Sequence, residues 1–174
     1  MESPITYEAR EGLRAALSKL PTVTLTALVG RPGKTFAEVQ SDADEVAASA
    51  PEVVVINLGS NDALKQVATH VTLAELEAMY AKFPESLLVA VAVTTRFTDS
   101  WFDVRAQAIN DHLRAGRRYR GVPVAVVAWD EIVAADDASA PPGDPILTVG
   151  LHPSPRGRAR RAQAVAEAVA PFAR

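Results

Sequence analysis

The sequence predicts an α/β fold, with a parallel, doubly wound sheet between two layers of helices. Three observations predict it. Short runs of Val, Ile and Leu recur along the chain, amphipathic segments lie between them, and the 174 residues suffice for one well-buried domain but not for two. We therefore expect a single domain over residues 1–174 and see no internal repeat.

Four apolar runs are predicted to be strands, because each is rich in Val, Ile or Leu and is bounded by Gly, Pro or polar residues. They are Val23 to Val29, Val53 to Leu58, Leu87 to Val93 and Val124 to Val127. The middle two are apolar almost throughout instead of alternating. This pattern is typical of strands covered on both faces, as in a parallel sheet.

Five segments are predicted to be helices, because their apolar residues recur at helical spacing. They are Tyr7 to Leu20, Phe36 to Ala50, Leu73 to Phe83, Asp103 to Ala115 and Pro155 to Ala170. Thr72 is the predicted N-cap of the third segment. Ala134 to Pro145 has linker character and is predicted to be a long surface loop.

Composition excludes several kinds of site and partner. The chain has no cysteine, which excludes disulfides, thiolate metal sites and a cysteine nucleophile. Its three histidines lack paired ligand spacing, so a structural zinc site is not expected. No cofactor is expected either. The net charge of −3 gives no reason to expect nucleic acid, and two clusters of arginines, at 114–120 and 156–161, are interpreted as solvated faces.

No apolar stretch reaches the roughly 20 residues of a membrane span. The first residues do not resemble a secretory signal, so we expect a cytoplasmic protein.

Chemistry in such a sheet gathers at the carboxyl ends of the strands, where three segments stand out. Asn61, in Gly-Ser-Asn-Asp, could donate to an oxyanion, although these residues are also common in turns. Gly33 lies in Gly-Arg-Pro-Gly-Lys-Thr, which fails as a phosphate loop on spacing but could present a backbone N–H to an anion. His152, before the last predicted helix, is a candidate general base or an ordinary surface histidine.

Together these features resemble the SGNH (GDSL-type) hydrolase family. Val53 to Asp62 resembles the family's third block, an apolar strand ending in Gly-x-Asn-Asp. Gly30 to Thr35 resembles the second block, and Gly150 to Gly157 the fifth, in which a histidine opens the last helix. The blocks occur in family order over nearly the whole chain. The resemblance implies hydrolysis of an ester or related acyl bond, with Gly33 and Asn61 as oxyanion-hole donors and His152 as the base.

Two positions depart from the family pattern. The family's nucleophile is the serine of a Gly-Asp-Ser segment. A gapless alignment puts Pro4 at that place, whereas one extra residue in the turn makes Ser3 the nucleophile. The family also has Asp three residues before the histidine, where this chain has Val149. Loss of that carboxylate removes a stabiliser of the imidazolium. Asp144 lies further back and could approach only if its loop folds inward.

The resemblance also places a first strand in the middle of the sheet, and the chain has no residues for it before Glu2. We therefore expect Val23 to Val29 and Val53 to Leu58 to pair directly, to accept a strand from another copy, or to leave backbone groups unpaired. A homodimer formed by strand exchange is one expected outcome, with residues 1–4 mobile or held by the second copy.

These observations support three functional interpretations. The first is an SGNH-type esterase acting on a small-molecule acyl substrate, with Ser3 and His152 as its catalytic pair. The second is a degenerate relative that binds a ligand or partner without turnover, with Pro4 at the nucleophile position. The third is altered chemistry in the same pocket, in which His152, Asp99, Asp103 or Glu131 takes a new role.

Overall fold

A three-stranded parallel sheet, in the order β1-β2-β5, forms the centre of the protein. The computed structural model describes residues 4–20, 22–95, 100–115, 118–119, 122–139, 144–148 and 150–173. The sheet strands are β1 (Val53–Ile56), β2 (Leu87–Val91) and β5 (Ala125–Val127). Two short strands, β3 (Arg118–Tyr119) and β4 (Val122–Pro123), form a separate antiparallel pair.

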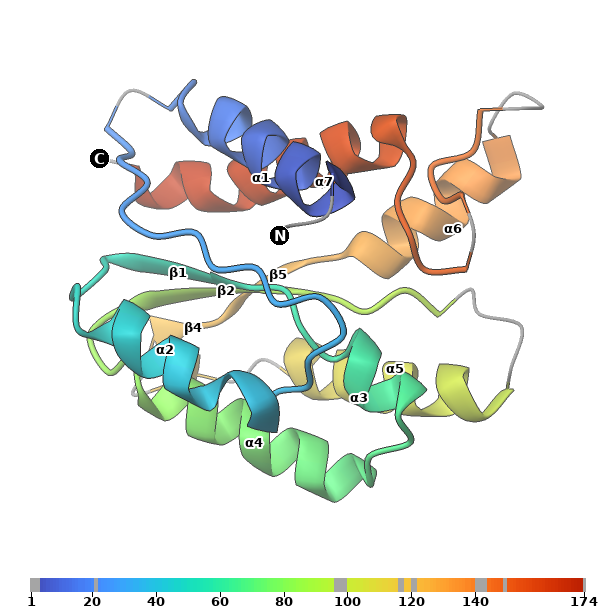
Figure 1. Cartoon of the computed structure of the whole chain (residues 1–174), viewed down its shortest axis with the longest axis horizontal. Coiled ribbons are helices and arrows are strands. Elements are labelled where there is room, and N and C mark those ends of the chain that lie inside the picture. Colours follow the sequence, from blue (N-terminus) through green and yellow to red (C-terminus); the bar gives the residue numbers. More distant parts are fainter. Residues whose placement is uncertain are drawn as a thin grey trace.

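Helices cover both faces of the sheet, as the sequence predicts (Figure 1). One face carries α1 and α7, and the opposite face carries α2, α4 and α5. The helices are α1 (Pro4–Leu17), α2 (Gln40–Ala47), α3 (Ser60–Leu64), α4 (Thr69–Ala81), α5 (Ser100–Arg114), α6 (Trp129–Ser139) and α7 (Pro155–Val169), with 3-10 turns η1 (Ala37–Val39) and η2 (Ala170–Phe172).

The strands divide the core in two because their side chains alternate between the faces. Leu88 and Ala90 of β2 pack with α2, α4 and α5, whereas Val89 and Val91 pack with α1, α6 and α7. All four are at most 2% exposed. A strand buried on both faces needs an apolar residue at every position, which explains the unbroken apolar run in the sequence.

One predicted strand is wrong. Val23 to Val29 forms no regular structure, although Val23 and Leu25 pack against the core on the α1 and α7 face. Val, Leu and Thr favour a strand only when a neighbouring strand takes their backbone hydrogen bonds. Among the described residues, β1 pairs with β2 and with no strand on its other edge, so direct pairing with this segment, the first of the three alternatives, does not occur.

Three local predictions need correction, one of a loop, one of a helix and one of a helix cap. The predicted surface loop over Ala134 to Pro145 begins inside α6, which Ala-rich sequence favours and the buried Val133 anchors. Phe36 to Ala50 is split between η1 and α2. Thr72 does not cap α4. It lies inside that helix and is 2% exposed, because α4 begins one turn earlier.

The end of β2 is held by a buried asparagine. Asn110, which is 0% exposed, accepts a hydrogen bond from the Val93 N–H and donates one to the Val93 carbonyl, both at 2.7 Å. Its amide also donates to Asp130 at 3.0 Å, and Asp130 pairs with Arg114. Two backbone groups beyond the strand are therefore satisfied by one side chain, which fixes α5 against the carboxyl end of β2.

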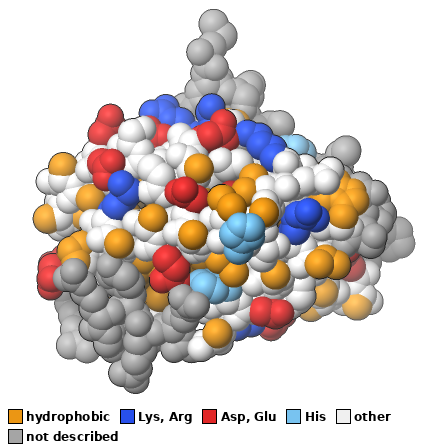
Figure 2. All heavy atoms as spheres, turned by 90° about the horizontal axis from the view of Figure 1, so that it is seen from below, with side chains coloured by type: hydrophobic (Ala, Val, Ile, Leu, Met, Phe, Trp, Pro, Cys, Tyr) orange, Lys and Arg blue, Asp and Glu red, His pale blue; other side chains and the backbone are white. Residues whose placement is uncertain are grey.

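The face opposite α1 and α7 carries acidic and basic side chains interspersed with apolar ones (Figure 2). Within the described part of the chain, no helix combines the length and the apolar character needed to cross a membrane.

Candidate active site

The first element of the candidate site is the turn Arg31 to Lys34. Gly33 has φ +74°, and the Lys34 N–H donates to the Arg31 carbonyl at 3.3 Å. Pro followed by Gly at the two central positions is the pattern of a type II turn, in which the third residue needs a positive φ. Gly33 is exposed, and its N–H donates to no acceptor among the described residues. This N–H is available to an anion.

The second element is the short helix α3, which starts directly after Gly59. Gly59 has φ +104°, and a Cβ there would lie 3.0 Å from a methyl carbon of Val93. Only glycine lets the chain turn this tightly against the end of β2. The turn presents Asn61, whose side-chain amide donates to the Lys34 carbonyl at 3.0 Å. An amide nitrogen carries two hydrogens, so a second donor remains on Asn61.

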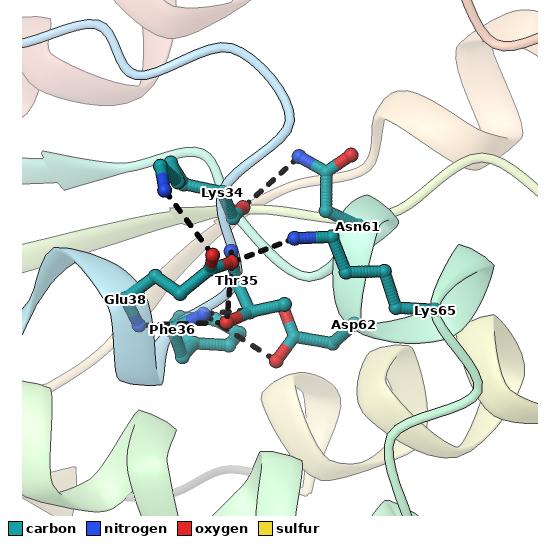
Figure 3. Close-up of polar contacts among 7 residues, drawn as sticks. All are labelled: Lys34, Thr35, Phe36, Glu38, Asn61, Asp62 and Lys65. Carbon is teal, nitrogen blue, oxygen red and sulfur yellow. Dashed lines mark hydrogen bonds and ion pairs between the residues drawn. The ribbon is translucent and has the colours of Figure 1, made fainter.

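Asp62 fixes the loop that follows the Gly33 turn through a second contact. Its carboxylate accepts from the Phe36 N–H at 3.2 and 3.4 Å, and the residue is 1% exposed. Burial raises the pKa of Asp62 to about 6, against the opposing effects of the Phe36 N–H and the nearby Lys65. Consecutive side chains, Asn61 and Asp62, thus hold the loop at two backbone points (Figure 3).

An ionic cluster closes this arrangement at the surface. Glu38 accepts from the Thr35 N–H at 2.9 Å, while the Thr35 hydroxyl accepts from the Glu38 N–H at 3.4 Å, which is the reciprocal pattern of a capping box. Lys65 lies 2.7 Å and Lys34 3.2 Å from the Glu38 carboxylate (Figure 3). Lys65 and the Thr35 N–H lower the pKa of Glu38 to about 2. The cluster ties the start of η1 to α3.

His152 lies at the tip of a small hairpin before α7. Leu147 and Pro153 form an antiparallel bridge, and the Thr148 N–H and hydroxyl donate to the His152 carbonyl at 2.9 and 3.0 Å. The Ser154 N–H donates to the Ile146 carbonyl at 2.9 Å. The imidazole is exposed, so solvent or a ligand can reach it.

The hairpin joins directly to α7. The Ser154 hydroxyl caps the helix by accepting from the Gly157 N–H at 3.0 Å. A Cβ on Gly157 would lie 1.9 Å from the Ile146 carbonyl oxygen, so the base of the hairpin packs against helix backbone. Leu151, next to His152, packs against the core that contains Phe36 and Ala63. The histidine hairpin and the Asn61 turn therefore border one core.

The predicted site residues differ in how far the structure describes them. Asn61 and the Gly33 turn are brought together, through the Lys34 carbonyl. Ser3, Val149 and Asp99 lie outside the described residues. Asp144 lies 3.7 Å from Arg156, and Glu131 lies 3.0 Å from Arg114. Their carboxylates are engaged with arginines.

Sequence reasoning missed the roles of Asp62, Glu38 and Lys65. A signal for Glu38 was present, because Thr35 and Glu38 have the spacing of a capping box. The burial of Asp62 depends on tertiary packing and has no local signal. No group of His, Cys, Asp or Glu in the described part of the chain could hold a metal ion.

Comparison with known proteins identifies the family to which this chain belongs. The sequence profile of the GDSL-like lipase/acylhydrolase family matches residues 5–160, and the chain belongs to this family. Among solved structures, the crystal structure of TesA is similar, with a TM-score of 0.67 and 18% sequence identity. The match covers 92% of this chain and 86% of that one, and it shows the shared fold. No curated protein matches the chain.

Proposed function

We propose that this protein hydrolyses an ester or related acyl bond of a small molecule, and that it does so slowly. The observation that carries the proposal is a pair of hydrogen-bond donors, one on Gly33 and one on Asn61. The Gly33 N–H has no acceptor within the described structure, and the Asn61 amide is oriented by the Lys34 carbonyl with one hydrogen left over. Two preorganised donors are what an acyl-transfer oxyanion requires.

The proposed catalytic pair is Ser3 and His152. Ser3 immediately precedes α1 in the sequence, and the amino end of a helix favours negative charge developing nearby. In the proposed reaction His152 takes the hydroxyl proton as Ser3 attacks the acyl carbon. Gly33 and Asn61 stabilise the resulting oxyanion, and the protonated His152 then gives its proton to the leaving group. His152 then takes a proton from water as the water attacks the acyl carbon. The bond from that carbon to the Ser3 oxygen breaks, and the protonated His152 returns a proton to Ser3.

A specific observation favours slow turnover. The position three residues before His152 is Val149, and the nearest carboxylate upstream of it, Asp144, lies beside Arg156. An imidazolium without a carboxylate partner is less stabilised in the transition state. The same observation supports the second candidate function, a protein that binds an acyl ligand without turnover and has Pro4 at the nucleophile position.

A short-chain activated ester tests the proposal. Ser3→Ala and His152→Ala should each remove most turnover, and the double variant should be little slower than either, because the two residues act as a unit. His70→Ala is the matched control, since His70 lies on α4 outside the site. A fluorophosphonate should label the wild type but not Ser3→Ala. Equal, negligible rates for wild type and Ser3→Ala, with the fold intact, would reject hydrolysis in favour of ligand binding.

A further inference from the structure

An unpaired cation lies at the carboxyl edge of the sheet. The guanidinium carbon of Arg161, on α7, is 5.8 Å from the ring centroid of Trp129, the first residue of α6. Trp129 comes two residues after the end of β5 and is 3% exposed, so it forms a buried wall at the edge where the strands end. Arg161 itself is half-buried.

Each of the other described arginines of α7 has a hydrogen bond or an ion pair, and within the described structure Arg161 has neither. Arg156 pairs with Asp136 at 2.5 Å, Arg158 donates to the Pro153 carbonyl at 3.2 Å, and Arg160 lies 3.6 Å from Glu167. Among the residues that the structure describes, Arg161 has neither a carboxylate partner nor a hydrogen-bond acceptor. A guanidinium carries five N–H donors, and a ligand with two acceptor oxygens can engage two of them at once.

The surroundings of Arg161 disfavour its positive charge when no anion is bound. Burial and the positive charge of Arg158 both lower the pKa of Arg161, which means that its surroundings disfavour the charged form. The aromatic ring compensates only in part, because a ring face attracts a cation more weakly than a carboxylate does. A bound anion would supply both the missing charge and the missing acceptors. The sequence predicts that the arginine cluster at 156–161 lies on a solvated face. Arg161 differs from this prediction, because it is half-buried beside Trp129.

We propose that Arg161, with Trp129 behind it, binds a carboxylate or phosphate group of a small-molecule ligand. Both groups present two oxygens that match two parallel N–H groups of a guanidinium. A halide offers no such pair of oxygens, so we expect the site to favour an oxyanion over a halide.

The position of Arg161 along α7 indicates which part of a ligand it would bind. Arg161 lies seven residues after Ser154, which is about 10 Å at the rise of an α-helix. The histidine hairpin and the anion site are therefore separated by roughly the length of a small metabolite. If the proposed acyl hydrolysis is correct, Arg161 selects substrates that carry an anionic group remote from the reacting bond. This last step rests on the proposed function, whereas the anion site does not.

Anion titration of the intact protein tests the site directly. Wild type, Arg161→Gln and Arg160→Gln are titrated with inorganic phosphate and, separately, acetate, with chloride added to keep ionic strength constant. Arg160→Gln is the matched control, because it removes the same charge one residue away. The readouts are the midpoint of thermal unfolding and the indole N–H resonance of Trp129. A ligand that binds only the folded state raises the midpoint in a saturable manner.

We expect phosphate, acetate or both to give a saturable response in wild type and Arg160→Gln, and the affinity to fall at least about tenfold in Arg161→Gln. A response to phosphate alone identifies a phosphate-bearing ligand, and a response to acetate a carboxylate. Without added anion, Arg161→Gln should be at least as stable as wild type, since it removes an unpaired charge. A linear response in wild type, an unchanged titration in Arg161→Gln, or destabilisation of that variant would overturn the proposal in favour of simple packing on Trp129.

A second assay separates the anion site from the proposed hydrolysis. If esters are cleaved, the ratio of kcat/KM for an ester of a dicarboxylic acid to that for its neutral analogue should fall at least about tenfold in Arg161→Gln. If no ester is cleaved, hydrolysis fails while the titration still decides the anion site. An unchanged ratio in a protein that does cleave esters refutes the role in substrate selection.

Discussion

Replacing Asp62 by Asn should change how the stability of this protein depends on pH. The pKa of folded Asp62 is about 6, against an ordinary value of 3.8, because the carboxyl is buried. The folded state therefore holds the proton more tightly than the unfolded state does. The stabilisation is complete below about pH 4 and is lost as the pH rises through about 6. A shift of about two units corresponds to on the order of 3 kcal/mol.

An asparagine cannot titrate, but it keeps an oxygen that accepts from the Phe36 N–H. Wild type should therefore lose stability between pH 4 and pH 7, and Asp62→Asn should not lose this contribution. The free energy of unfolding of the variant, relative to that of wild type, should rise by on the order of 3 kcal/mol over this range. Any pH-independent cost of the new amide hydrogens cancels in this difference. Urea unfolding at pH 4, 5, 6 and 7 measures it.

Asp42→Asn provides a control of opposite sign. Arg31 lowers the pKa of Asp42 through a hydrogen bond and through its charge. The stability contributed by that pair is present above the ordinary pKa and is lost as the pH falls, so the variant should be the less stable protein at pH 7 and approach wild type in acid. A stability difference for Asp62→Asn that does not vary with pH would refute the raised pKa of this buried carboxyl.

Three further substitutions test the contacts around the site by urea unfolding. Gly59→Ala should cost about 2–3 kcal/mol, because φ is +104° and the new Cβ would lie 3.0 Å from Val93. Gly157→Ala should cost about 3 kcal/mol or more, because its Cβ would lie 1.9 Å from the Ile146 carbonyl oxygen; a smaller cost would show that the hairpin base can move. Asn110→Ala should cost on the order of 3 kcal/mol by leaving the N–H and carbonyl of Val93 unpaired, and near-normal stability would contradict that pairing.

Gly12→Ala is the control for both glycine variants. A Cβ at this position on α1 meets no atom within 4 Å. Because alanine is the better helix former, this variant should be more stable than wild type by about 0.5–1 kcal/mol.

The sequence predicts the central strands well because their residues are apolar at every position, whatever lies around them. Val23 to Val29 has the same composition and is not a strand, because strand formation also requires a partner edge that no local pattern reveals. Helix α6 was missed for a related reason. Its Asp residues are typical of loops, but the burial of Val133 and the pairing of Asp136 with Arg156 support a helix.

The candidate site divides in the same way. Asn61 and the Gly33 turn could be predicted to meet, because each follows an apolar run at one edge of the expected sheet. The Asp62 contact with Phe36 joins residues 26 positions apart and depends on how η1 packs over α3. No spacing rule covers such a contact, so only the folded chain reveals it.

The histidine hairpin has a consequence for how this protein can evolve. Its base is locked by the bridge between Leu147 and Pro153 and by the contact of Ile146 with Gly157, and Thr148 donates two hydrogen bonds to the His152 carbonyl. Substitutions of the exposed His152 therefore alter the chemistry presented to a ligand at little cost to folding, whereas Leu151 beside it is packed against the core. A single codon change at position 149 could place a carboxylate three residues before His152, so under the proposed hydrolysis the support of the imidazolium can change while the scaffold stays the same.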